Sequence, residues 1–456
     1  MHVLLSVHQF FPEFATGGTE VLAYQTARAL MQCGHRVTVL SGHSGPVDLP
    51  HEQRFVWDDY DGIRILRYLH AHFTSPLQTN VVESEYKSAH FLALFRPLLA
   101  NLAPSVVHFF HFSRLSATAI DAVDELGLPM VFTPTDFWPL CVNSQLRLPN
   151  NDLCEGPTAS ADNCLRHYVQ MTQSPETQAQ FNALSPRKVE VLIRGDHRHK
   201  FTKQWFGGFV RAVTDRPAYL RNQMNRMERI LAPTQLMYQM LQRHGVETKR
   251  LYHSPYGVSV ENIPRQTDRG RGAALKVGFI GQLVEHKAPH LLIEAVKGLP
   301  AEVTIEAEIY GDLKQDVGYG ARLMSLAASE PRVHFRGTFP NAQIGAVFAG
   351  LDVLVVPSIW YENTPLVIYN ALAAGCPLVV TNLGGMAEPV PENVAGLHFP
   401  RGDVPALRRQ LLKLYQDRDF LRRLSAGTKI PKTIPEYVDE LHGHYAFARY
   451  MRKGSA

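Results

Sequence analysis

Cysteine and long apolar runs are both scarce in this chain, and each shortage excludes a class of protein. Only five of the 456 residues are cysteine, which is too few for the disulfide framework of a small secreted scaffold. The longest apolar stretch, residues 91–103, contains Arg96 and Pro97 and falls short of the roughly 18 residues that span a membrane. The first residues lack a basic segment and a small-residue cleavage site, which predicts a cytoplasmic protein.

Charge of one sign is equally scarce. The 46 Lys and Arg residues are nearly balanced by 42 Asp and Glu residues, which leaves a formal net charge of +4. A nucleic-acid-binding chain usually carries a marked basic excess, so no nucleic-acid partner is expected. With 45% hydrophobic and 19% charged residues, the composition is that of an ordinary globular protein.

Short apolar runs alternate with stretches of helical spacing along most of the chain. Residues 2–7 (HVLLSV) predict a buried strand, Glu20 to Cys33 a helix, and residues 36–41 (RVTVLS) the next strand. A strand, helix, strand order predicts parallel pairing and an α/β fold. Further strands are predicted at residues 63–68, 105–110, 130–135, 229–234, 276–281, 303–311, 332–337, 351–358 and 377–382.

Two polar interruptions divide this pattern into domains. One has few apolar runs and several prolines, and the other is rich in Gly, Pro and Arg. We predict two doubly wound, Rossmann-like domains, with ligands bound at the carboxyl ends of the strands and in the cleft between the domains. The predicted parts are an N-terminal domain at 1–262 with an irregular insertion at about 141–206, a linker at 263–274, a C-terminal domain at 275–431 and a final helix at 432–456.

A helix that suits a phosphate is predicted directly after Glu362. Thr364 is expected to be its N-cap and Pro365 its first residue, with Gly375 at its end. The free N–H groups and the dipole of the first turn attract an anion. The alternative is that Glu362 is a solvated loop acid and Thr364 only a cap.

Five segments, in order along the chain, resemble one family. They are GGTE (17–20), FTPTDFWPLC (132–141), GFIGQLVEHK (278–287), IYGD (309–312) and WYENTPLVIYNALAAGCPLVVTNLGG (360–385). Together they resemble the family 4 retaining glycosyltransferases of the GT-B fold, in which two Rossmann-like domains face a central cleft. The resemblance implies transfer of a hexose-type sugar from a UDP- or GDP-linked donor to an acceptor hydroxyl, with retention and with no metal or other cofactor at the donor.

The resemblance also implies donor contacts in the C-terminal domain. Lys287 would bind the donor phosphates, and Glu362, the first acid of a Glu-x7-Glu pattern, would contact the transferred sugar. Gln282 replaces an arginine found in many members, and Asn370 replaces the second acid, which usually binds the ribose. Both replacements remove a charge, which implies either weaker donor binding or an unusual donor. The same segment adds Asn363, Thr364, Pro365 and Leu366 to the expected donor site.

In the N-terminal domain, the resemblance places the donor against the loop of Gly17 and Gly18, where the alternative is an ordinary flexible turn. His111 is expected near the transferred sugar as a catalytic residue, although spacing alone does not separate it from His108, and a core histidine is the alternative. Asp136 is expected either to bind the acceptor or to cap a loop.

The cysteines raise a separate hypothesis. Cys141, Cys154, Cys164 and His167 offer three thiolates and one imidazole, and the last two are spaced Cys-x2-His. This donor set suits a tetrahedral structural zinc that would staple the insertion. Buried free thiols are the alternative.

Several functional alternatives stay open. The neutral residues Gln282 and Asn370 permit a catalytically silent GT-B subunit, and a nucleotide-sugar epimerase or hydrolase of the same fold is a further alternative. The acceptor is expected to be a glycan, a lipid-linked molecule or a small molecule, in polysaccharide, glycan or glycolipid biosynthesis. The helical stretch 87–102 and the basic part of the insertion suggest peripheral contact with the inner face of a membrane.

Overall fold

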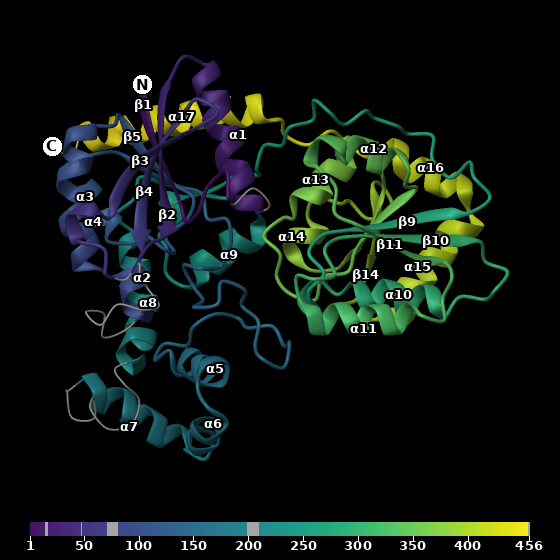
Figure 1. The fold of residues 1–456 in the computed structure, drawn as a ribbon, viewed down its shortest axis with the longest axis horizontal. Helices are drawn as coiled ribbons and strands as arrows, with labels where there is room; N and C mark the ends of the chain where they lie inside the picture. The colour runs from purple at the N-terminus through teal and green to yellow at the C-terminus, as the bar shows by residue number, and fades with distance from the viewer. Residues whose placement is uncertain (14–16, 47, 71–80, 198–208, 455–456) are drawn as a thin grey trace. The chain divides into compact units, whose positions relative to one another are not determined.

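The computed structural model describes residues 1–13, 17–46, 48–70, 81–197 and 209–454. The chain divides into two compact units, each coloured by residue number in Figure 1. Unit 1 comprises Met1–Pro233, Met237–Tyr256 and Ile434–Ala456, and unit 2 comprises Thr234–Leu236 and Gly257–Thr433.

Unit 1 is built on an eight-stranded sheet of order β3-β4-β2-β1-β5-β6-β7-β8. Every neighbouring pair is parallel except β3 and β4. All six residues of the central strand β1 are buried, because a central parallel strand is covered on both faces. The strands are β1 His2–Val7, β2 Arg36–Ser44, β3 Phe55–Tyr60, β4 Ile63–His70, β5 Val106–Phe109, β6 Met130–Phe132, β7 Arg229–Ala232 and β8 Leu251–His253.

The helices of unit 1 include three within the segment predicted to be irregular. That prediction is wrong for the described part of the insertion, because apolar residues recur there at helical spacing, as Leu165 and Val169 do in α5. The helices are α1 Gly18–Gln32, α2 Val81–Tyr86, α3 Ala89–Leu102, α4 Ala119–Glu125, α5 Asp162–Thr172, α6 Pro175–Asn182, α7 Pro186–His197, α8 Phe209–Met224, α9 Gln235–Arg243 and α17 Ile434–Lys453, with short 3-10 turns η1 His51–Gln53 and η2 Thr248–Arg250.

The final helix α17 packs on unit 1, beside α1 and against β5 and β6 (Figure 1). Its Tyr445 hydroxyl lies 2.7 Å from Nδ1 of His108, whose Nε2 lies 2.8 Å from the Thr133 hydroxyl. His108 is completely buried, and burial lowers its pKa to about 3. The structure therefore separates the two histidines that spacing could not, because His108 is a core residue.

Unit 2 is built on a six-stranded, fully parallel sheet of order β11-β10-β9-β12-β13-β14. Figure 1 shows α10 and α11 on one face of this sheet and α12 and α13 on the other. The strands are β9 Leu275–Ile280, β10 Ile305–Tyr310, β11 Val333–Gly337, β12 Val353–Val356, β13 Leu378–Thr381 and β14 Gly396–Phe399. The helices are α10 Pro289–Lys297, α11 Val317–Ala327, α12 Ile344–Ala349, α13 Leu366–Ala373, α14 Gly384–Ala387, α15 Val404–Gln416 and α16 Arg418–Gly427, with short 3-10 turns η3 Glu285–Lys287 and η4 Asn341–Gln343.

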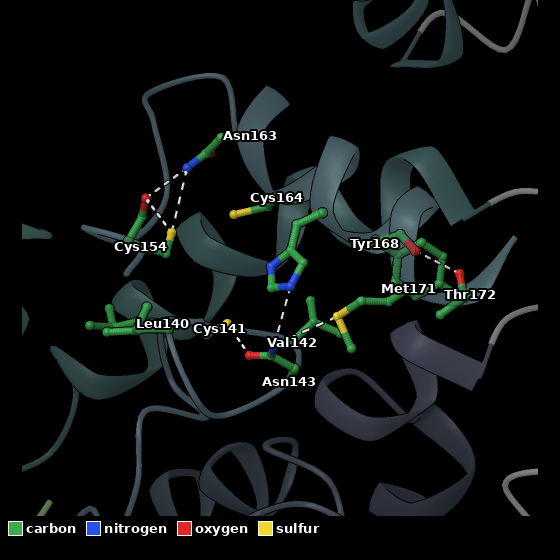
Figure 2. A pocket seen from close by; sticks show the side chains of 13 residues that line it. Leu140, Cys141, Val142, Asn143, Cys154, Asn163, Cys164, Tyr168, Met171 and Thr172 are labelled. Atoms are coloured by element: carbon green, nitrogen blue, oxygen red, sulfur yellow. Dashed lines mark hydrogen bonds between the residues drawn. The ribbon is translucent and has the colours of Figure 1, made fainter. Parts of the chain in front are cut away.

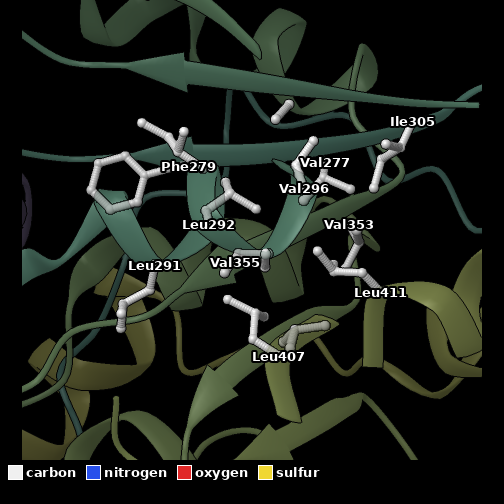
Figure 3. Close-up of a cluster of buried hydrophobic side chains, with 14 of the residues drawn as sticks. Val277, Phe279, Leu291, Leu292, Val296, Ile305, Val353, Val355, Leu407 and Leu411 are labelled. Carbon is white, nitrogen blue, oxygen red and sulfur yellow. The ribbon is translucent and has the colours of Figure 1, made fainter. Parts of the chain in front are cut away.

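A large apolar core lies under one face of this sheet (Figure 3). Val277 and Val353 contribute from neighbouring strands, Leu292 from α10, and Leu407 and Leu411 from α15. All five are fully buried. This core packs the sheet against its helices and so fixes where the loops at the strand ends begin. The two parallel-sheet units confirm the predicted α/β class.

The segment predicted as a linker, residues 263–274, is packed on unit 2. The buried guanidinium of Arg269 donates hydrogen bonds to five backbone carbonyl oxygens of this unit, those of Gln266, Phe348, Leu351, Ala374 and Gly375. The chain instead crosses between the units next to Tyr256 and Thr433. Composition suggested a free linker because Arg and Gly are typical of loops, whereas here an arginine satisfies carbonyl groups at helix and strand ends.

Across the described ranges, we find no helix that has both the length and the apolar character needed to span a bilayer.

Candidate active site

Two loops of unit 2 meet at the carboxyl edge of its sheet. One follows β9 and contains the 3-10 turn that ends at Lys287, and the other follows β12 and contains Glu362. β9 and β12 are parallel neighbours in the sheet, so their carboxyl ends lie next to each other at the same edge. The backbone N–H of Ile359 donates to the carbonyl oxygen of His286 over 2.9 Å, which ties the two loops together. This edge is where parallel α/β sheets bind ligands.

The centre of this edge is an ion pair. Nζ of Lys287 lies 2.6 Å from Oε1 of Glu362. The same oxygen accepts hydrogen bonds from the Ser358 hydroxyl at 2.8 Å and from the indole N–H of Trp360 at 3.0 Å. Glu362 is only 5% exposed. Three donors on one oxygen fix the carboxylate in place and hold the ammonium group at the edge of the sheet.

Thr364 does not cap the helix, so that prediction is wrong. Its φ of +63° is left-handed, and Pro365 takes the N-cap position, so that α13 begins at Leu366. The backbone at this turn lies against α14, because a Cβ atom on Gly385 would lie 1.9 Å from the Glu362 carbonyl oxygen and 2.8 Å from the Thr364 nitrogen. Glycine at position 385 permits this close approach. Strained backbone of this kind concentrates at functional sites.

The other predicted donor residues lie around the same edge. Asn363 is buried, and its Oδ1 accepts a hydrogen bond from the Thr234 hydroxyl at 3.2 Å. Asn370 is half-buried one turn into α13, and Gln282 is exposed just after β9. Pro365 and Leu366 are half-buried at the start of α13.

A second group of polar side chains lies in unit 1, at the carboxyl ends of β1 and β5. His111, which is buried, has both ring nitrogens engaged. The Ser113 N–H donates to Nδ1 at 3.0 Å, so Nε2 carries the hydrogen that faces Asp136 at 3.0 Å. Burial alone would raise the pKa of the Asp136 carboxyl, but His111 and the Trp138 N–H more than offset it and hold the pKa below its usual range. Asp136 therefore orients His111, a contact that the sequence did not predict.

Gly17 belongs to the same group for a steric reason. A Cβ atom there would lie 2.0 Å from the carboxylate of Glu20, which folds back over the start of α1. Glu20 is buried and pairs with Nε2 of His8 at 3.2 Å, while the His8 ring lies 4.4 Å from that of His111, centroid to centroid. The neighbouring Gly18 is the first residue of α1. A carboxylate at this helix start occupies the place where a phosphate would gain from the dipole.

The cysteines predicted to bind zinc line one small pocket, with His167 (Figure 2). Burial, with the neighbouring thiols Cys141 and Cys154, raises the pKa of Cys164 to about 12. As the side chains lie, no three His, Cys, Asp or Glu residues in the described part of the chain are arranged to hold a metal ion. The structure thus brings the four donors to one cavity without forming a coordination site.

Sequence reasoning missed four residues of these groups. Ser358 and Trp360 bind Glu362, and Glu20 and His8 build the unit 1 group. The available signals were local: Trp360 stands two residues before Glu362, and Glu20 closes the GGTE segment. What the sequence could not show is that Ser358 and Trp360 share one acceptor oxygen.

Comparison with known proteins identifies the family. The model of glycosyltransferase family 4 matches residues 16–262, and a model described as glycosyl transferases group 1 matches residues 274–417. A GDP-mannose-dependent alpha-mannosyltransferase of Mycobacterium tuberculosis is 26% identical over 250 residues, which cover 52% of this chain and 62% of that protein. A D-inositol 3-phosphate glycosyltransferase of Corynebacterium efficiens is 31% identical over 180 residues, which cover 35% of this chain and 40% of that protein. The matched segments span about half the length of these relatives.

Solved structures of other proteins superpose on almost the whole chain. Sucrose-phosphate synthase from Thermosynechococcus elongatus superposes with a TM-score of 0.61 at 16% identity, covering 99% of this chain and 97% of that one. Anabaena HepE in complex with UDP-glucose gives 0.62 at 16% identity, covering 98% and 99%. These likenesses show the GT-B fold. Because one family model alone matches more than half of the residues, the chain belongs to glycosyltransferase family 4.

Proposed function

We propose that this protein is a retaining glycosyltransferase that moves a hexose-type sugar from a nucleotide-sugar donor to an acceptor hydroxyl. The observation that carries the proposal is the Lys287–Glu362 pair at the carboxyl edge of the unit 2 sheet. The family match supports it, as do a relative named for GDP-mannose and a structural neighbour solved with UDP-glucose. A UDP- or GDP-linked donor is the corresponding expectation.

In this proposal Lys287 binds the donor phosphates. Its ammonium group, about one-fifth exposed, is held in place by Glu362 before the donor arrives. A positive charge that is already in position stabilises the negative charge that develops on the leaving phosphate, at no cost of rearrangement. Lys287 thereby supplies the charge that a divalent cation supplies in other transferases, so we expect catalysis without a metal.

Glu362 orients the transferred sugar. Its Oε1 is occupied by three donors, so the carboxylate is better suited to accept hydrogen bonds from sugar hydroxyls than to remove a proton. Retention then proceeds by front-face attack, in which the leaving phosphate takes the proton of the acceptor hydroxyl. The turn at Thr364 and the first N–H groups of α13 complete the phosphate cradle.

The unit 1 group serves the sugar and the acceptor. His111 is oriented by Asp136, and a buried carboxylate, Glu20, covers Gly17. Carboxylates and imidazoles form hydrogen bonds with hydroxyl groups, whereas the negative carboxylate of Glu20 beside Gly17 would repel a phosphate. We therefore propose that Gly17 and Gly18 contribute a surface for hydroxyls, with the donor phosphates relying on unit 2. Asp136 acts on the acceptor through His111.

Location and pathway stay predictions. The five cysteines are free thiols, as is usual in the reducing cytoplasm. In α3, Phe91, Phe95 and Leu99 are buried in unit 1, while Leu92, Leu94, Leu98 and Leu102 are half-buried, so peripheral membrane contact would depend on these leucines and on the basic insertion. Part of that insertion, residues 198–206, lies outside the described residues.

A thermal-shift screen of UDP and GDP sugars tests the proposed function. A ligand at 100 times its Kd stabilises the folded state by about 2.7 kcal/mol, which shifts the unfolding midpoint by several degrees. We expect one nucleotide sugar to give this shift and to be consumed when an acceptor is supplied. No shift with any nucleotide sugar or nucleoside diphosphate would contradict the proposal. Binding without consumption on any acceptor would instead support the silent subunit that Gln282 and Asn370 permit.

Asn370 provides a test of the ribose contact. If its side chain faces the ribose, Asn370→Glu should tighten donor binding by about 1 kcal/mol, or roughly fivefold, because charged hydrogen bonds exceed neutral ones by that amount. Asn370→Gln is the matched control, since it supplies the length of Glu without its charge and should leave Kd within about twofold. Calorimetric titration with the best donor measures both. Weaker binding by Asn370→Glu would show a site specialised for a neutral residue.

A further inference from the structure

Outside the candidate active site, a small pocket of unit 1 brings together three cysteines and a histidine; we call it the cysteine pocket. Cys164 and His167 stand one turn apart on α5, and Cys141 and Cys154 reach the same pocket from the segment before it. Figure 2 shows the sulfur atoms of Cys154 and Cys164 directed toward the same space, with Cys141 on the facing side. Three sulfur donors and one imidazole in a single pocket match the donor set of a structural zinc site.

The backbone holds these donors in place. The N–H of Cys141 donates to the Phe137 carbonyl at 2.8 Å, and the N–H of Cys154 donates to the Leu146 carbonyl at 2.7 Å. Two residues after Cys154, Gly156 adopts a left-handed φ of +94°, where a Cβ atom would lie 2.2 Å from Nε2 of His244. The loop that carries Cys154 is therefore fixed against His244, the residue that follows α9, as well as against Leu146.

The pocket has the size of an ion site. Its volume is about 60 Å³, which is room for only a few water molecules at roughly 10–15 Å³ each. Apart from the four donors, its wall is mainly apolar, with Leu140, Val142, Leu146 and Met171 among the lining residues. A nucleotide sugar does not fit this volume, so the pocket is distinct from the proposed donor site.

A buried positive charge lies beside the pocket and forms no direct ion pair. Arg216 is 2% exposed, and its guanidinium lies 4.5 Å from the centre of the Trp138 ring and donates to the Trp138 carbonyl. Its Nη1 is buried without a hydrogen-bond partner, and the acidic groups near enough to act on its charge include the Cys141 and Cys164 thiols and the Glu85 carboxyl, which forms no direct ion pair with it. An unpaired buried charge is costly. Zinc with three thiolates and a neutral imidazole carries one negative charge, which would balance the guanidinium.

Asn143 explains why the donors do not form a coordination site as they lie. Its Oδ1 accepts a hydrogen bond from the Cys141 thiol at 2.8 Å, and its Nδ2 lies 3.2 Å from Nε2 of His167. In this arrangement the Cys141 thiol keeps its proton and donates a hydrogen bond to Asn143, so its sulfur is not free to bind a metal ion. Asn143 is also held independently by the Gln145 N–H and the Arg147 carbonyl, each at 3.0 Å. Asn143 would therefore stay anchored if Cys141 and His167 turned into the cavity to bind an ion.

We propose that Cys141, Cys154, Cys164 and His167 bind one Zn²⁺ ion that staples the segment before α5 to that helix, with Arg216 as the counter-charge. Three thiol protons pass to solvent as three Zn–S bonds form, and no oxidation or reduction takes place. The site is structural, because all four positions are filled by protein donors and no open position remains for a substrate. The proposal does not depend on the transferase activity.

Metal analysis of the full chain, purified without chelators, tests this site. We expect about one zinc per chain, lost in Cys154→Ser and Cys164→Ser and kept in the matched controls Cys33→Ser, which is exposed, and Cys376→Ser, which is buried in unit 2. Folded wild-type protein that contains no zinc, and that binds none when Zn²⁺ is added, would overturn the proposal. Equal zinc in all four variants would overturn the ligand assignment.

A second measurement keeps the proposal testable if the serine variants do not fold. Wild-type protein stripped with a chelator should bind Co²⁺ with the intense near-ultraviolet absorption of thiolate-to-cobalt charge transfer, at one equivalent. Arg216→Met should weaken zinc affinity about 10- to 100-fold, as loss of an outer partner of a metal site commonly does, whereas Arg216→Lys should retain most of it. A cobalt complex without thiolate bands would show that the cysteines are not ligands.

Discussion

Replacing Lys287 by alanine is expected to lower turnover about 10²–10³-fold, the usual effect of removing one group aimed at developing negative charge. The structure supports a large effect, because the ammonium group is held 2.6 Å from a buried carboxylate and is not a mobile surface charge. Steady-state kinetics with the donor found in the ligand screen measures it. The fall should appear mainly in kcat, since the charge on the phosphate grows as the glycosidic bond breaks.

Lys276→Ala is the matched control for that variant. Lys276 is half-exposed in β9 and lies 3.9 Å from Glu306, away from the carboxyl edge of the sheet. It should leave turnover unchanged, since exposed pairs contribute about 0–1 kcal/mol to stability and nothing to the donor site. If Lys287→Ala retained near-normal turnover with intact folding, the role of Lys287 at the phosphates would be wrong.

Glu362→Gln is expected to lower turnover roughly 10- to 100-fold while nucleoside diphosphate binds almost as before. The lost interactions are charge-assisted hydrogen bonds worth about 1.5–3 kcal/mol each, and in the proposal they are made to the sugar and not to the nucleotide. Gln also releases Lys287 from its ion pair. Calorimetry with the diphosphate and kinetics with the nucleotide sugar separate the two effects.

Glu308→Gln is the control for burial and charge. Glu308 is a buried carboxylate on β10 that pairs with Arg336, so this variant changes stability without touching the proposed site. We expect a lower unfolding midpoint and normal turnover. If Glu362→Gln abolished diphosphate binding, Glu362 would lie against the phosphates and not against the sugar.

The order of strands and helices could be predicted from the sequence because local patterns carry it. Residues 2–7 are apolar without interruption and form the central strand β1 within the same bounds. The edge strand β3, residues 55–60, was missed for the opposite reason. All six of its side chains are exposed or half-exposed, and it joins the sheet through antiparallel pairing with β4. Nothing in its composition requires that partner.

Individual residues of the candidate site could be predicted only where they belong to a recognisable sequence motif. Lys287 and Glu362 were expected in one site, and the structure places them in contact. The predicted N-cap at Thr364 is wrong, because Thr364 has a left-handed φ and its backbone packs closely against Gly385 of α14, a tertiary contact that local sequence does not show. Asp136 was expected to bind the acceptor or to cap a loop; it accepts a hydrogen bond from the Trp138 N–H in its own loop and also lies against His111, which the sequence did not predict.

The sequence by itself determined the α/β class and the presence of two such units, and it predicted part of each polar group, Lys287 with Glu362 and His111 with Asp136. Periodicity and motif spacing carry this information because they act within a few turns of chain. Tertiary structure decided which side chains contact the same acceptor atom and which pack side by side. Three donors converge on one oxygen of Glu362, and Arg216 is buried beside thiols that lie 52 to 75 positions away in the sequence. Such contacts depend on packing between distant segments, which local propensity does not encode.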